Sequence, residues 1–169
     1  MWAVVGDRVI TESELRLERA LAPIDPGPVP PLEARRADAE RFLVELAIVR
    51  ALAGSTAVYQ PEPARVRERL DALRAAFPSP AAWTAFLAEH GLNEDALRAV
   101  LYSRMVVERY VQRNLGLAAR AEPTADWDAR YAAWIDAQRA RVSIREIPEL
   151  DTPEAGPAGR EAGAPARRR

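Results

Sequence analysis

Short apolar segments with strand character lie near both ends of the chain. Residues 2–5 and 8–10 are mostly aliphatic, and the Gly6-Asp7 pair between them suits a two-residue hairpin loop, because glycine can adopt the positive φ of a type II′ turn. Residues 141–147 alternate polar and apolar side chains, which is the periodicity of a strand. An isolated hairpin is only marginally stable in water. We therefore expect segment 141–147 to be the third strand of one small sheet.

Most of the chain between these segments has apolar residues at helical spacing. Capping residues, glycines and prolines divide it into separate helices, with a proline-rich loop at residues 23–31. The expected helices run from Thr11 to about Ala22, from about Leu32 to Ala53, from just after Pro61 or Pro63 to Pro78, from Ser79 to His90, from Asn93 to about Leu115, and onward from Thr124. The pattern predicts a mostly α-helical fold with a small β-sheet formed by the N-terminal hairpin and a C-terminal strand.

The longest predicted helix, residues 94–115, is apolar on two sides. Its main stripe comprises Leu97, Val100, Leu101, Val107, Val111 and Leu115. A second strip at four-residue spacing contains Tyr102, Val106 and Tyr110. A helix with this pattern either lies between two other elements or leaves one side for a ligand.

Length and composition limit the classes of protein that remain. The 169 residues suffice for one domain, predicted over residues 1–148, and residues 149–169 are so rich in Pro, Gly, Ala and charge that we expect a disordered tail. The formal net charge of −1 gives no electrostatic reason to expect binding to nucleic acid or to an anionic membrane. No apolar run approaches the roughly 20 residues that span a bilayer. Because cysteine is absent, disulfides, thiolate catalysis and cysteine-based zinc sites are excluded.

Few residues are candidates for catalysis or for metal binding. His90 is the only histidine and stands at a predicted helix end, where a structural role is expected. Asp126 and Asp128 flank a tryptophan in a predicted first helical turn, where acidic residues are favourable in any case. Ser13 and Ser103 lack the glycine context of a nucleophile elbow. We therefore expect no enzymatic activity, no metal and no cofactor.

The order of several segments resembles the N-terminal domain of the SurA family of chaperones. The first segment is residues 3–15, a Val-rich strand and a turn that end in VITESEL. The others are residues 77–98 ending in HGLNEDALR, VVERYV at residues 106–111, and RVSIREI at residues 141–147 after Tyr131. The resemblance covers roughly residues 3–148 and implies a helical SurA N-terminal-like domain. Its implied function is that of a periplasmic-type holdase, which binds unfolded polypeptides such as envelope or outer-membrane proteins. The family often continues into a parvulin-type prolyl isomerase domain. Here only the tail follows Ile147, so isomerase activity is not implied.

A holdase needs exposed apolar surface on a rigid scaffold and no catalytic residue. The expected client-binding residues are Tyr102, Val106 and Tyr110, with the alternative that they pack beneath another helix. Two other functions stay open: a module that docks one specific folded partner, and a fragment of a SurA-type prolyl isomerase. We expect a periplasmic location if a signal segment has been removed ahead of Met1, and a cytoplasmic one if Met1 is the true start. The sequence makes no prediction of oligomeric state.

Overall fold

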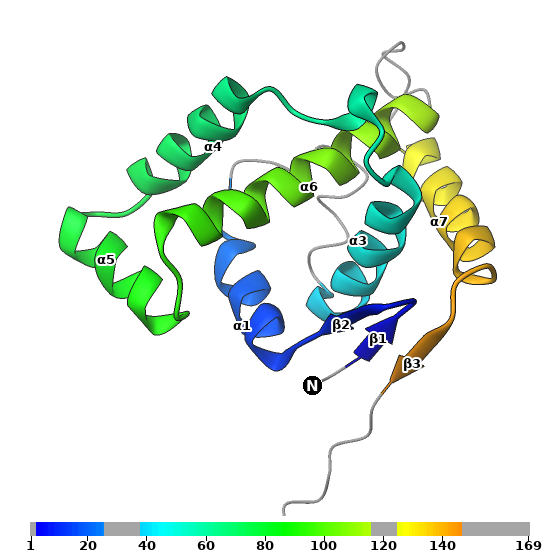
Figure 1. The fold of residues 1–169 in the computed structure, drawn as a ribbon, viewed down its shortest axis with the longest axis horizontal. Helices are drawn as coiled ribbons and strands as arrows, with labels where there is room; N and C mark the ends of the chain where they lie inside the picture. The colour runs from blue at the N-terminus through cyan, green and yellow to red at the C-terminus, as the bar shows by residue number, and fades with distance from the viewer. Residues whose placement is uncertain (1–2, 26–37, 116–124, 147–169) are drawn as a thin grey trace, which may run out of the picture.

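The computed structural model describes residues 3–25, 38–115 and 125–146 (Figure 1). Within these residues the chain forms six α-helices, one short 3₁₀ helix and a small three-stranded sheet. The expected mostly α-helical fold with a small sheet is confirmed. The predicted tail, residues 149–169, lies outside the described residues.

The sheet joins the two ends of the described chain. Strands β1 (Ala3–Val5) and β2 (Arg8–Ile10) form the expected hairpin, and β3 (Ile144–Glu146) pairs antiparallel with the other edge of β1, so the strand order is β2-β1-β3. Gly6 has a φ of 62°, whereas among the described residues no residue other than glycine has a positive φ, so Asp7 has the negative φ that the second loop position of a type II′ turn requires. The third strand is shorter than the predicted segment 141–147 because residues 141 and 142 belong to the turn that follows a helix.

Helix α1 (Glu12–Leu21) begins at the predicted capping box. Thr11 Oγ1 accepts a hydrogen bond from the backbone N–H of Glu14 (3.2 Å), and Glu14 Oε2 accepts one from the backbone N–H of Thr11 (2.9 Å).

Helix α3 (Ala39–Ala53) begins later than the predicted Leu32, so that boundary was wrong. Asp38 has an extended backbone and accepts a hydrogen bond from Arg41 N–H (3.0 Å), which caps the helix at that point.

The middle of the chain contains the 3₁₀ helix η1 (Ala57–Tyr59) and helices α4 (Pro63–Ala75), α5 (Pro80–Glu89) and α6 (Glu94–Asn114). Ser79 and Asn93 cap α5 and α6 as predicted. Helix α7 (Ala125–Arg139) precedes β3, and its predicted cap, Thr124, lies outside the described residues. The element η1 was not predicted.

Helix α6 runs through the middle of the domain and contributes to two separate hydrophobic cores (Figure 1). The first core lies beside the sheet and contains, among others, Ala3, Val5, Ile10, Phe42, Ile48, Val107, Val111, Tyr131 and Ile135. The second lies between α1, α4 and α5 and contains, among others, Leu17, Leu21, Leu70, Leu73, Trp83, Leu97 and Leu101. Of the two alternatives for this helix, the cores show that α6 lies between other elements, with its N-terminal half in the second core and its C-terminal half in the first.

Candidate functional site

The predicted client-binding strip on α6 is only partly exposed. Val106 is fully buried, with 0% exposure, and Tyr102 and Tyr110 are half-buried. The segment that includes η1 contacts both tyrosines. The hydroxyl of Tyr102 donates a hydrogen bond to Gln60 Oε1, and the ring of Tyr110 lies 4.8 Å from that of Tyr59 between centroids.

Further contacts hold the segment that includes η1 on α6. Arg109 donates a hydrogen bond to the backbone carbonyl of Gln60, and the ring of Tyr110 also packs against Trp134, with the centroids 6.2 Å apart. Burial, with a further contribution from Tyr59, raises the pKa of Tyr110 above its ordinary value of 10.0. In this conformation residues 57–60 therefore pack on the two tyrosines of the strip, which agrees with the alternative that the strip packs beneath another helix.

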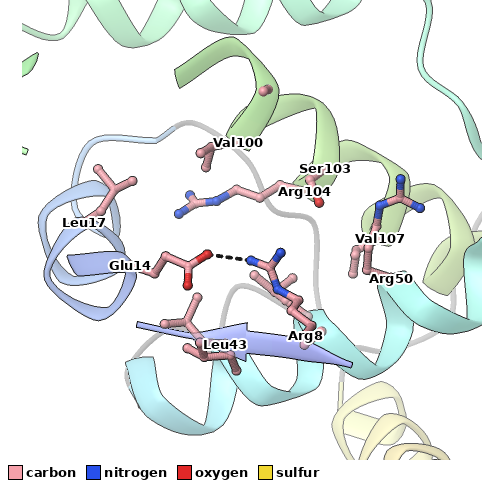
Figure 2. Close-up of a pocket in the computed structure, with 13 residues that line it drawn as sticks. Arg8, Glu14, Leu17, Leu43, Arg50, Val100, Ser103, Arg104 and Val107 are labelled. Atoms are coloured by element: carbon pink, nitrogen blue, oxygen red, sulfur yellow. Dashed lines mark hydrogen bonds and ion pairs between the residues drawn. The ribbon is translucent and has the colours of Figure 1, made fainter. Parts of the chain in front are cut away.

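A different apolar surface is open, where the two cores meet on α6. It is a half-enclosed cleft of about 270 Å³ between β2, α1, α3 and α6 (Figure 2). Its apolar lining consists of Ile10, Leu17, Leu43, Leu46, Ala47, Ala99, Val100 and Val107. Leu43, Leu46 and Val100 keep part of their surface in contact with solvent. The volume lies just below the roughly 300–1,000 Å³ typical of small-molecule sites, so the cleft has room for one or two apolar side chains.

Polar groups stand at the rim of the cleft. The guanidinium of Arg8 on β2 forms an ion pair with Glu14 on α1 (2.6 Å), as Figure 2 shows by a dashed line. Arg50, on α3, also lines the cleft and donates a hydrogen bond to the backbone carbonyl of Gly54 (2.6 Å). An apolar floor with few oriented polar groups is the usual composition of a binding site.

Arg104 lines the cleft and also belongs to a buried ion-pair network. Its side chain is 7% exposed and donates hydrogen bonds to Glu18 on α1 and to Asp25 Oδ2 (3.0 Å) just after α1. Asp25 in turn accepts two hydrogen bonds from Arg69 on α4, at 2.9 and 2.8 Å. The network connects α6 to α1 and α4, so these ion pairs fix the position of the α6 wall of the cleft.

The outer end of this network is a carboxylate with a perturbed pKa. Arg69 donates hydrogen bonds to both oxygens of Glu108, at 2.7 and 2.8 Å. Burial raises the pKa of Glu108 above its ordinary value of 4.5, although the charge of Arg69 acts in the opposite direction. The pKa of Arg69 is itself raised: burial lowers it, but hydrogen bonds and charges from Asp25 and Glu108 outweigh that effect.

The other chemically interesting residues do not converge on a site. His90 ends α5, and its ring packs against Phe86 with centroids 4.8 Å apart. Ser103 lines the cleft, but among the described residues no hydrogen bond joins it to a histidine or a carboxylate. The side chains of Asp126 and Asp128 lie outside the part of the chain that the structure describes. Over the described ranges, no group of three histidine, cysteine or acidic side chains is placed to hold a metal ion.

Comparison of the chain with protein-family models, with curated proteins and with solved structures finds no match in any of the three. None of the helices in residues 3–25, 38–115 and 125–146 is both long enough and apolar enough to cross a membrane.

Proposed function

We propose that this protein is a non-catalytic polypeptide-binding domain, a holdase, which holds apolar segments of unfolded chains in the cleft between α3 and α6. The observation that carries the proposal is an open apolar cleft on a rigid wall. Leu43, Leu46 and Val100 remain partly exposed there, while the α6 side is fastened by the Arg104 network. The resemblance to SurA-type chaperones supports the same function and suggests envelope or outer-membrane proteins as clients.

The size of the cleft sets the expected strength of binding. Burying one Leu, Val or Phe side chain contributes roughly 1.5–3 kcal/mol, so a single segment should bind weakly. An unfolded chain offers many such segments, and repeated engagement raises its apparent affinity. Weak and sequence-tolerant binding is suited to a holdase, whereas docking of one folded partner needs a larger complementary surface.

The proposal is tested by the suppression of aggregation of several unrelated unfolded proteins diluted from denaturant. The purified protein is expected to suppress aggregation, and Val100→Glu to lose that activity because a carboxylate in the apolar cleft disfavours apolar clients. Val58→Glu is the matched control, because Val58 is 45% exposed on η1 and does not line the cleft. Circular dichroism establishes that each variant is folded.

A second variant guards against misfolding of Val100→Glu. Ser103→Phe fills the cleft with an apolar side chain and should weaken client binding without adding a charge. Suppression that survives both cleft variants would contradict the proposal, as would a wild-type protein that ignores all unfolded clients and captures one folded partner stoichiometrically.

A further inference from the structure

The charged groups at the cleft are unevenly balanced. Three guanidiniums, those of Arg8, Arg50 and Arg104, line it together with one carboxylate, that of Glu14. Because Glu14 compensates Arg8, and Glu18 and Asp25 compensate Arg104, the charge at the cleft that has no carboxylate beside it, within the described part of the chain, is that of Arg50. The apolar floor lowers the local dielectric and strengthens the attraction of this charge for an anionic group. The cleft is therefore suited to a ligand that has both apolar and acidic character.

The three guanidiniums differ in the ion-pair and hydrogen-bond partners that they already have. Arg104 belongs to the buried network with Glu18 and Asp25, and Arg8 is paired with Glu14. Arg50 has no carboxylate partner among the described residues, and its guanidinium donates a hydrogen bond to the backbone carbonyl of Gly54. An arginine presents several donors in a planar fork, so one bond to a carbonyl leaves others for a carboxylate.

The position of Arg50 puts this cation beside the apolar floor. It lies on α3 one turn beyond Leu46, and both residues line the cleft. An extended peptide rises about 3.3 Å per residue and points successive side chains to opposite faces, so the side chains that share a face are two positions apart, about 6.6 Å along the axis. If one residue inserts near Leu46, the residue two positions away therefore points to the same face and lies within reach of Arg50.

We propose that the cleft selects segments of unfolded polypeptide in which an acidic residue stands two positions from an aliphatic or aromatic one. The apolar side chain enters between Leu46 and Val100, and the carboxylate pairs with Arg50. This selectivity rests on the proposed function, because it concerns the same cleft, but it is a separate property and has a separate test.

The test measures fluorescence anisotropy of labelled apolar peptides that differ only at one position, which is Glu, Gln or Lys. At low salt the Glu peptide is expected to bind about fivefold more tightly than the Gln peptide, and the Lys peptide more weakly than both. The preference should shrink as salt is added. Arg50→Gln should abolish the Glu-over-Gln preference, and Arg50→Lys should retain most of it.

Two further variants separate a local pair from a general charge effect. Arg65→Gln removes the same charge from α4, where the side chain is 69% exposed and lies away from the cleft, and it should leave the preference intact. Glu14→Gln should increase the preference, because it releases Arg8 while glutamine still serves in the capping box.

The possible outcomes distinguish a failure of the selectivity from a failure of the holdase function. Equal binding of the Glu and Gln peptides to the wild type, or an equal loss of preference in Arg65→Gln and Arg50→Gln, overturns the selectivity while the holdase function stands. Failure of every apolar peptide to bind at any salt concentration removes the basis of both proposals.

Discussion

The buried network behind the cleft makes a strong quantitative prediction, which concerns Arg104→Met. Methionine keeps the length and flexibility of the arginine stem but removes the guanidinium, so Glu18 and Asp25 lose its hydrogen bonds. Glu18 is fully buried, with 0% exposure, and the side chain of Arg104 is 7% exposed. Removing one member of a buried pair leaves the other charge poorly compensated and costs about 3–5 kcal/mol. At roughly 2–4 °C per kcal/mol, the midpoint of thermal unfolding should fall by roughly 6–20 °C.

The assay is urea unfolding followed by tryptophan fluorescence, with thermal unfolding as a second probe. Arg98→Met is the matched control on the same helix, because Arg98 pairs with Asp95 at the surface, where the two side chains are 42% and 84% exposed. That control should cost less than about 1 kcal/mol. The double variant Arg104→Met with Glu18→Met should recover much of the lost free energy, because an apolar pair often replaces a buried ion pair without net cost. If Arg104→Met costs no more than Arg98→Met, the network does not fasten α6 to α1.

Two further predictions concern titration and capping. The pKa of Glu108 is raised in the folded chain, so folding favours its protonated form. The difference in unfolding free energy between the wild type and Glu108→Gln should therefore change in favour of the wild type as the pH falls from neutral toward 4.5, by at most about 1.4 kcal/mol per pH unit. Denaturant titrations across that range check this, and a difference that shrinks on acidification would contradict the assigned direction. Thr11→Ala should lower the unfolding free energy by about 1 kcal/mol through loss of the α1 cap, whereas Ser13→Ala, beside it on the surface, should change it little; equal losses would refute the capping role.

The parts of the fold that local chemistry determines could be predicted from the sequence. Thr11, Ser79 and Asn93 each cap a helix as expected, since a capping side chain needs only its own next few residues. The sheet was also predictable, because strand periodicity occurs at two places and a hairpin needs a third strand. The predicted start of α3 was wrong because the apolar pattern does not reveal that Asp38 has an extended backbone and caps the helix.

The candidate site depends on tertiary packing and could not be predicted in the same way. Tyr102 and Tyr110 have the spacing of a helical face, and that spacing is the same whether solvent, a client or residues 57–60 cover it. The cleft combines three distant parts of the chain, namely β2 with α1, α3, and α6, and each apolar residue in its lining also fits a core position. One signal was available in advance: Arg104 interrupts the apolar stripe between Leu101 and Val107, which indicates either a buried ion pair or a functional charge.

Occupation of this cleft by unfolded polypeptide is tested most directly by thiol protection. The chain has no cysteine, so Ser103→Cys introduces a single reactive group in the lining of the cleft, and Ser55→Cys supplies an exposed control beyond the end of α3. The rate of alkylation at each position is measured with and without a saturating unfolded client. Slower alkylation at position 103, with an unchanged rate at position 55, is the predicted result. Equal rates at position 103 with and without a bound client would contradict the account.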